Sequence, residues 1–226
     1  MKNLLILGII AMLPFQKKFS GAWELKEGSV THTLVIADDY FSLTSFDIPG
    51  KKFIRTQGGT CVQKGDELVG KIEYHTDDKT KVGSVYAWPL QSGTHKITIS
   101  RDGKKETWQQ TDDGTGSLAG NWRITGRDQN GKMIEIKPAA RKTIKLLSGR
   151  RFQWAAINTE TGEFFGTGGG NYTFENGKYT EHIEFFSRDS SRVGMSLSFD
   201  GRVEGRNWYH SGKSSKGDPI SEVWSR

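Results

Sequence analysis

The sequence predicts an all-β protein built from two copies of one antiparallel domain, and three observations lead to this interpretation. Helical periodicity is almost absent along the chain. Runs of β-branched and aromatic residues instead alternate with clusters of Gly, Asp, Asn and Lys at intervals of about ten residues, a spacing typical of an antiparallel barrel or sandwich. Matching residues recur at a fixed distance in the two halves. A chain of 226 residues accommodates two domains of ordinary size.

The repeat keeps a constant offset over its central part. Six matched pairs, each separated by 111 positions, are Phe53 and Phe164, Thr56 and Thr167, Gly58 and Gly169, Ile72 and Ile183, Asp78 and Asp189, and Val82 and Val193. With small shifts the match extends to residues 21–23 and 120–122, and to residues 106–108 and 222–224. The period is far longer than a solenoid repeat, so it indicates duplication of a whole domain.

The first residues differ in composition from both copies. Lys2 precedes an apolar run over residues 4–15, and Lys17 and Lys18 follow it. A positive start and a short apolar stretch are typical of a secretory signal, and the stretch is too short to cross a bilayer. We therefore predict a signal peptide or an uncleaved N-terminal anchor over residues 1–18, with a buried first strand or helix as the alternative.

Cysteine usage and charge narrow the class of protein. The single cysteine, Cys61, cannot form an internal disulfide, and we interpret it as a small buried residue. No cysteine stands where a lipoprotein signal requires one. These features favour a bacterial exported protein that is periplasmic, at the cell surface or secreted. The net charge of +6 is scattered over loops, which favours a solvated surface over a nucleic-acid partner.

Turn residues divide each copy into short strands. Strands are expected in the first copy near residues 21–26, 31–37, 40–46, 52–55, 59–63, 67–75, 82–88, 94–100 and 104–110. The second copy has expected strands near residues 120–125, 141–147, 150–157, 163–166, 169–175, 178–186, 193–199, 202–210 and 219–225. Asn176-Gly177 and Asp200-Gly201 predict hairpin turns. The glycines at 168–170 predict a bulge or a sharp bend.

A polar, glycine-rich segment at residues 112–117 has the composition of a linker. It predicts one domain over residues 19–111 and a second over residues 118–226. The copies differ in their first loop: Trp23 and Thr33 are 10 positions apart, whereas Trp122 and the matching Thr143 are 21 apart. The longer loop, residues 126–142, has apolar side chains that could cover a barrel mouth or pack against the other domain.

Each copy begins with Gly-x-Trp, continues with about eight to ten short strands, and ends in a charged and aromatic pattern. These features resemble the lipocalin-like, or calycin, barrels. The second half resembles more closely a family of lipocalin-like domains of exported bacterial proteins, through residues 120–122, 168–174, 179–185, 208–212 and 222–226. The resemblance implies two tandem antiparallel lipocalin-like β-barrels, each with an early tryptophan, Trp23 or Trp122, that plugs its closed end. Such barrels commonly hold small apolar or amphipathic molecules.

The expected strand at 178–186 places a carboxylate on an apolar face. With a period of two residues, Tyr179, Glu181, Ile183 and Phe185 share one side, which should point into the barrel. The first copy has Gly70 where the second has Glu181. A buried charge needs a partner or water, so Glu181 makes either a structural ion pair with an inward cation or a ligand contact.

The last strands bring further side chains toward the same interior. Alternation places Trp208 with His210, and Glu222 with Trp224, and Trp154 joins them from an earlier strand. An aromatic cavity with a few polar groups is the usual makeup of a small-molecule site. The predicted ligand-binding residues are Trp154, Glu181, Trp208, His210, Glu222 and Trp224, and the matching set in the first copy is Tyr74, His95, Glu106 and Trp108.

We therefore expect an exported, non-enzymatic protein that binds a small hydrophobic or amphipathic molecule in a barrel lumen, in the second domain. Nucleophile-elbow, HExxH and paired-cysteine motifs do not occur, so no catalytic residue, metal or cofactor is predicted. One alternative is a structural or interaction module that binds an exported protein or a polysaccharide through its outer surface. Another is a hydrolase or lyase that uses Glu181, His210 and Glu222. A lumen of roughly 300 Å³ or more favours a ligand site, and a filled lumen favours the interaction module.

Overall fold

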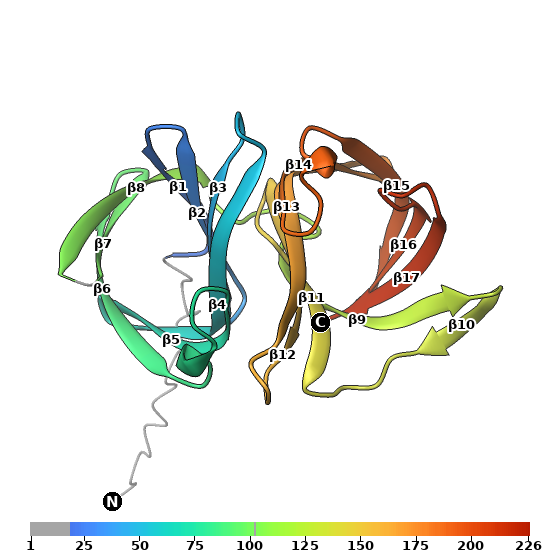
Figure 1. Ribbon diagram of the computed structural model, residues 1–226, viewed down its shortest axis with the longest axis horizontal. Helices are drawn as coiled ribbons and strands as arrows, with labels where there is room; N and C mark the ends of the chain where they lie inside the picture. Colours follow the sequence, from blue (N-terminus) through green and yellow to red (C-terminus); the bar gives the residue numbers. More distant parts are fainter. Residues whose placement is uncertain (1–18, 102) are drawn as a thin grey trace, which may run out of the picture.

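The computed structural model describes residues 19–101 and 103–226, so the predicted signal peptide or anchor over residues 1–18 lies outside the described residues. The described chain forms two closed, eight-stranded antiparallel β-barrels in tandem (Figure 1). Helical structure in these residues is confined to two short 3-10 turns, η1 (Lys79–Lys81) and η2 (Ser190–Arg192). The predicted all-β fold of two tandem antiparallel barrels is confirmed.

The first barrel follows chain order, and its last strand pairs with its first. Its strands are β1 (Gly21–Glu27), β2 (Val30–Ala37), β3 (Tyr40–Asp47), β4 (Lys52–Lys64), β5 (Glu67–His75), β6 (Val85–Gly93), β7 (Lys96–Arg101) and β8 (Lys104–Asp112). Alternating burial along strands such as β5 places apolar side chains on the lumen side.

The second barrel repeats this order and adds one strand outside the closed ring. Its strands are β9 (Gly120–Gln129), β10 (Lys132–Glu135), β11 (Arg141–Leu147), β12 (Arg151–Asn158), β13 (Phe164–Glu175), β14 (Lys178–Phe186), β15 (Ser196–Glu204), β16 (Asn207–Lys213) and β17 (Pro219–Ser225). Pairing of β17 with β9 closes the ring.

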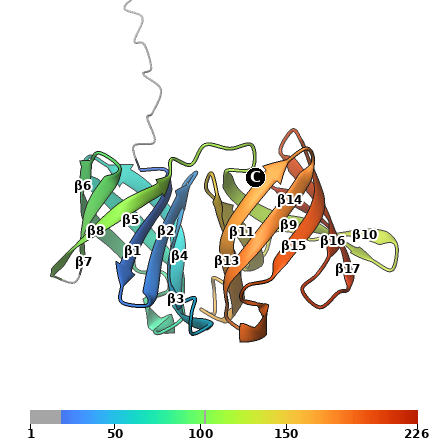
Figure 2. The same cartoon turned by 90° about the horizontal axis from the view of Figure 1, so that it is seen from above.

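The longer first loop of the second copy forms a hairpin. β9 continues to Gln129, turns at Asn130 and Gly131, which both have positive φ, and returns as β10. The hairpin projects from the second barrel on the side away from the first (Figures 1 and 2). The apolar hairpin therefore does not pack against the other domain, although Lys142, the last residue of the 126–142 loop, reaches the first barrel through an ion pair with Glu73 at 2.7 Å.

Strand pairing shows that the insertion in the second copy ends one residue away from where the sequence comparison placed its end. Trp23 pairs with Leu34, and Trp122 pairs with Lys145. Lys145 is thus the counterpart of Leu34, and the constant offset of 111 already applies there. The matching of Thr33 with Thr143 is wrong, because the counterpart of Thr33 is Ile144.

The sequence analysis predicted a gap between two strands just before each glycine pair, and both gaps are wrong. β4 and β13 are each one long strand that runs through Gly58-Gly59 and Gly169-Gly170. The register shifts at both places, as the predicted bulge requires. A Cβ on Gly170 would lie 2.0 Å from the His182 carbonyl oxygen, so glycine is needed there for close approach of the next strand, not for a chain break.

Two strand boundaries late in the second copy differ from the prediction. Asp200-Gly201 was expected to turn the chain but lies inside β15. The turn falls instead at Gly205, whose φ is +59°. A Cβ on Gly201 would lie 3.1 Å from the Phe174 ring and 3.2 Å from the Trp208 ring, so the position inside the strand suits a glycine. The turn predicted at Asn176-Gly177 is confirmed, with φ values of 50° and 75°.

The two barrels pack together through β2–β5 of the first and β11–β14 of the second (Figure 1). A hydrophobic cluster joins them, distinct from the core of either barrel. It contains Ala22, Val35, Ala37, Tyr40, Tyr74, Ile144, Leu146, Ala155 and Ile157. Each barrel therefore has its own interior, and a third apolar cluster fixes one barrel on the other.

This interface is symmetric with respect to the repeat. Phe53 and its counterpart Phe164 stack with ring centroids 6.5 Å apart. Phe53 lies 6.3 Å from Phe185, and the counterpart pair of Phe164 and Tyr74 has the same separation. A surface that meets its own copy in this way is isologous, as in a two-fold dimer. The barrels are thus arranged as a homodimer whose subunits have become one chain.

A buried amide stands near the centre of the interface. Gln153 accepts hydrogen bonds from Ser42 and Thr44 at 2.6 and 2.7 Å. Its side-chain nitrogen donates to Thr56 and Thr167, both at 3.0 Å. Every member is buried, so the network is satisfied within the protein and specifies one orientation of the two barrels.

Candidate ligand-binding site

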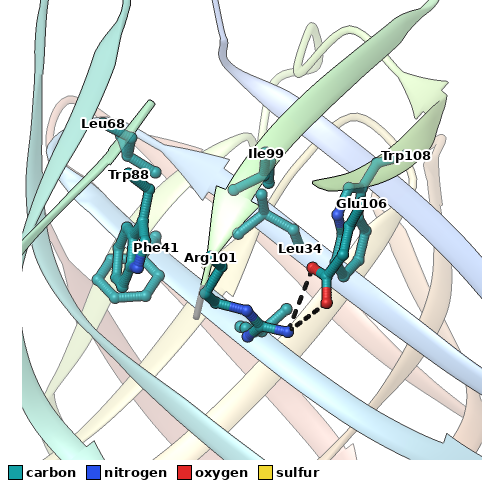
Figure 3. A pocket seen from close by; sticks show the side chains of 9 residues that line it. Leu34, Phe41, Leu68, Trp88, Ile99, Arg101, Glu106 and Trp108 are labelled. Atoms are coloured by element: carbon teal, nitrogen blue, oxygen red, sulfur yellow. Dashed lines mark hydrogen bonds and ion pairs between the residues drawn. The ribbon is translucent and has the colours of Figure 1, made fainter. Parts of the chain in front are cut away.

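The interior of the first barrel is nearly full. The cavity at its centre is about 20 Å³, room for about one water molecule. A second cavity of about 190 Å³ lies beside Arg101 toward one end of the barrel, and polar side chains such as His32, Ser45 and Asp77 line it. The Trp88 ring packs edge-on against Phe41 at 5.3 Å, and Arg101 donates to both oxygens of Glu106 at 3.0 and 3.2 Å (Figure 3). These side chains occupy the lumen from opposite sides, so the apolar centre of the first barrel has no space for a ligand of ordinary size.

The second barrel has the same topology but a cavity of about 580 Å³, within the usual size of a small-molecule site. Five of the six predicted ligand-binding residues line it: Trp154, Glu181, His210, Glu222 and Trp224. The sixth, Trp208, is fully buried and packs against the His210 ring with centroids 5.2 Å apart. The structure thus brings all six together.

One difference between the barrels lies at the last strand. Strand pairing makes Glu222 the counterpart of Glu106, and Gly212 the counterpart of Arg101. In the second barrel the partner of Glu222 is Arg127, from the extended β9, with nitrogens 2.8 and 3.2 Å from Oε1. The lumen therefore loses the arginine that partly fills the first barrel, and the carboxylate keeps a guanidinium partner from the hairpin.

A second difference between the barrels concerns the side chains that β5 and β6 place in the first lumen and those that β14 and β15 place in the second. Trp88 sits over Gly70 in the first barrel, where a Cβ would lie 2.8 Å from the indole ring. The counterparts in the second barrel are Phe199 and Glu181. Phe199 instead approaches Gly212, whose Cβ would lie 2.7 Å from that ring. The smaller ring is held against the wall, which leaves the middle of the lumen open.

Glu181 forms a buried ion pair. The Lys145 ammonium donates to it at 2.9 Å, and both side chains are less than a tenth exposed. The same ammonium lies 5.0–5.2 Å from the ring centroids of Tyr179, Trp208 and Trp224, within cation–π range. The structural ion pair proposed for Glu181 is present, with Lys145 as the partner that the sequence did not reveal, and Glu181 still faces the cavity.

Glu222 is held in its charged form. Burial alone would raise its pKa, but a polar contact from His210 Nδ1 at 3.7 Å, the Lys145 ammonium and the Arg127 guanidinium outweigh burial and lower the pKa to about 2. Trp224 also donates its indole N–H to Oε2 at 3.1 Å. Glu222 is therefore an anion at neutral pH and a poor proton donor or acceptor.

His210 is buried and neutral. Burial and the Lys145 ammonium lower its pKa, against the opposite effect of Glu222 and Glu181. Its ring packs 4.1 Å from the Phe199 ring, centroid to centroid. Nδ1 lies 3.7 Å from Glu222 Oε2, beyond hydrogen-bond distance. Within the described chain neither ring nitrogen has a hydrogen-bond partner.

The cavity opens at one end of the barrel, where β11 begins and β14 ends. This mouth carries Arg141, Phe165, Arg188 and Asp218, which line the cavity. Arg141 stacks over the Phe165 ring at 4.5 Å, and Arg188 donates through Nε to the Phe165 carbonyl. Sequence reasoning missed both arginines because they lie outside the alternating part of the strands.

The tryptophans predicted as plugs are buried in the cores of their own barrels, Trp23 in the first and Trp122 in the second. Trp122 donates its indole N–H to the Leu118 carbonyl at 2.7 Å. The Arg226 guanidinium lies 4.4 Å over the Trp122 ring, so the C-terminal residue covers it from outside.

Two residues of the matching set in the first copy were misplaced. Glu106 and Trp108 do face the first lumen. Tyr74 belongs to the interface between the barrels, and His95 is an exposed turn residue with φ of 53°. The counterpart of His210 is Ile99, since Ile99 pairs with Glu106 as His210 pairs with Glu222.

Phe185, expected to face the lumen with Glu181, also turns to the interface, where it packs 4.7 Å from Phe46. The cause is an extra residue in β14: Gly169 pairs with Phe185 and Gly170 with Ile183, which leaves Glu184 unpaired. A bulge interrupts the alternation of side chains.

Comparisons with known proteins identify no relative: no family model, no curated protein and no solved structure matches the chain. In residues 19–101 and 103–226, no helix has the length and apolar character needed to cross a membrane. In those residues no group of three His, Cys, Asp or Glu side chains is placed to hold a metal ion.

Proposed function

We propose that this protein is an exported, non-enzymatic binding protein that holds a small hydrophobic or amphipathic ligand in the lumen of the second barrel. The observation that carries the proposal is the contrast between the two interiors. The second barrel has one continuous cavity of about 580 Å³, whereas the first has about 20 Å³ at its centre and a separate polar cavity of about 190 Å³ beside Arg101. Both barrels share strand order and a common repeat, so the fold does not require the larger cavity.

The lining of the larger cavity suits such a ligand. Aromatic and aliphatic side chains, among them Trp154, Phe199 and Leu197, supply the walls, and a few polar groups stand among them. That combination is usual for small-molecule sites.

Export and membership of the lipocalin-like family belong to the same proposal. The leader composition of residues 1–18 supports export, and the Gly-x-Trp starts together with the tandem barrels support the family resemblance. On this basis the protein acts in the bacterial periplasm, at the cell surface or outside the cell, and takes its ligand from that compartment.

A hydrolase or lyase has less support. A general acid or base works best with a pKa near the operating pH. The pKa of Glu222 is lowered to about 2, away from that range, and Glu181 is held by Lys145.

The interaction module also has less support, because the exposed large apolar residues in the described chain are scattered and include only one aromatic, Tyr86.

The test is native mass spectrometry of the purified protein after incubation with an organic extract of the producing cells. We expect a retained molecule on the wild type. Ala156→Trp, which fills the mouth side of the lumen, should lose it, whereas Ala87→Trp, on the exposed outer side of β6, should keep it. Retention by neither wild type nor control, in repeated extracts, would contradict the proposal.

A further inference from the structure

His210 has unused hydrogen-bonding capacity inside the cavity. Its side chain is 3% exposed, lines the cavity, and has no hydrogen-bond partner at either ring nitrogen among the described residues. Buried polar atoms in folded proteins nearly always have a partner, and leaving one without a partner is costly. A ligand in the cavity would supply the missing contact.

The charges around His210 are already balanced. Lys145 pairs with Glu181 at 2.9 Å, and Arg127 pairs with Glu222 at 2.8 Å. A charged ligand group placed among them would add an uncompensated charge in a buried site, which is strongly unfavourable. The group that reaches His210 should therefore be neutral and able to donate or accept a hydrogen bond, as a hydroxyl or a carbonyl can.

At the mouth of the cavity, in contrast, the charges are not balanced. Arg141 and Arg188 are exposed and line the cavity, and in the described residues no ion pair joins either of them to a carboxylate. Asp218 is the acidic residue at this end, so the mouth carries a net positive charge. A guanidinium binds a carboxylate through two parallel hydrogen bonds, which fits an acidic head group at this position.

We propose that the second barrel takes an anionic amphiphile whose apolar body ends in a neutral hydroxyl or carbonyl group. That group hydrogen-bonds to His210, and the acidic head lies between Arg141 and Arg188. The inference rests on the proposed function. Arg141 lies four residues from Lys145 along β11, about 13 Å of extended strand, so the two ends suit a linear chain of medium length.

Three matched probes test the inference by isothermal titration calorimetry on the full chain: decanoic acid, 10-hydroxydecanoic acid and 1,10-decanediol. The hydroxy acid should bind more tightly than decanoic acid by about fivefold to tenfold, the effect of one hydrogen bond in a buried site. It should also bind more tightly than the diol, because the diol lacks the acidic head.

Variants test whether His210 causes the preference for the hydroxyl group, and whether Arg141 and Arg188 cause the preference for the acidic head. His210→Phe should bind decanoic acid and its hydroxy derivative equally, while His210→Gln, which keeps a donor and an acceptor, should retain part of the difference. The control His182→Phe lies on the exposed outer side of β14 and should behave as the wild type. Arg141→Gln with Arg188→Gln should remove the preference for the acid over the diol, and Arg202→Gln, in an exposed pair with Glu204, should not.

Equal binding of decanoic and 10-hydroxydecanoic acid by the wild type would overturn the inference. An unchanged preference in a folded His210→Phe variant would do the same; if this variant does not fold, His210→Gln and the wild-type series decide. Failure of all three probes to bind, or binding that Ala156→Trp leaves unaltered, would also overturn the inference. The proposed function is tested separately, because it stands or falls with the molecule that the wild type retains from the cell extract and Ala156→Trp loses.

Discussion

At the scale of single residues, the second lumen is defined by charges that the first lacks. Lys145 and Glu181 stand where the first barrel has Leu34 and Gly70. Their ion pair lies against three aromatic rings and is less than a tenth exposed. Removing one member of a buried pair is strongly destabilising, whereas replacing both can be neutral.

This pair gives the first prediction. Lys145→Leu alone should lower the free energy of unfolding by about 3–5 kcal/mol, because it leaves the Glu181 carboxylate buried without a cation. The double variant Lys145→Leu with Glu181→Gly, which installs the residues of the first barrel, should recover most of the loss. Urea unfolding of the three proteins measures both values. A double variant as unstable as the single one would contradict this account of the pair.

The second prediction concerns Glu222 and acid. Its pKa is lowered to about 2 from an ordinary 4.5, so the unfolded chain binds a proton more readily than the folded protein does. Its contribution, at most about 3 kcal/mol, is complete above pH 4.5 and is lost as the pH falls toward 2. Glu222→Gln should therefore flatten the pH dependence of the unfolding free energy between pH 4.5 and 2.

The control for this effect is Glu204→Gln, because Glu204 forms an exposed ion pair with Arg202 and exposed pairs contribute little. Urea unfolding of wild type and both variants at several pH values gives the slopes. Equal slopes for wild type and Glu222→Gln across this range would show that the carboxylate titrates normally in the folded protein.

At the scale of elements, two related bulges set the shape of each barrel. In β5 the extra residue is Glu73, opposite Gly58-Gly59, and in β14 it is Glu184, opposite Gly169-Gly170. Each bulge turns the next aromatic side chain, Tyr74 or Phe185, from the lumen to the interface. The bulges therefore link the inside of each barrel to the surface where the barrels meet.

The third prediction tests the glycine that permits this approach. A Cβ on Gly170 would lie 2.0 Å from the His182 carbonyl oxygen, a backbone atom that cannot move aside easily. Gly170→Ala should destabilise the fold by about 2–4 kcal/mol through overpacking and strain. The control Gly116→Ala meets its nearest neighbour at 3.7 Å and should change the melting temperature little. Similar melting temperatures for the two variants would contradict the close approach.

The sequence predicted those elements that follow simple alternation. Glu181 was placed in the lumen correctly because β14 alternates regularly up to Ile183. Phe185 was misplaced because an unpaired Glu184 cannot be recognised without knowing the partner strand. Lys145 was missed because its strand is buried on both faces, so hydrophobicity does not tell the lumen side from the interface side.

The matching of His95 with the site in the second barrel failed for a different reason. The offset of 111 still holds at this strand and makes Ile99 the counterpart of His210, as the strand pairing shows. The last strand has a larger offset, 116 between Glu106 and Glu222, because the turn before it is longer in the second copy. The match of His95 with His210 placed this change of offset one strand too early.

At the scale of the whole molecule, the two barrels form one body through an isologous interface. The Gln153 amide makes four hydrogen bonds to side chains that surround it, and the pairs Phe53 with Phe164 and Ser42 with Gln153 each join counterparts of the repeat. The apolar cluster at this interface covers the outer side of the second barrel along β11 and β12.

The fourth prediction follows from this arrangement. Gln153→Met keeps the side-chain length but leaves the buried hydroxyls of Ser42, Thr44 and Thr167 with fewer partners. It should cost about 2–4 kcal/mol of unfolding free energy. Gln109→Met, at an exposed position of β8, is the control and should cost little. A loss no larger in Gln153→Met than in the control, by urea unfolding, would show that the amide network does not hold the barrels together.

The most direct measurement is a high-resolution crystal structure of the full chain purified from the cells that produce it, without added ligand. The account predicts continuous non-protein density in the second barrel, in contact with His210 and Trp154, and no such density in the first. A second barrel filled by its own side chains, with Phe199 and Trp154 closing over the space, would contradict it.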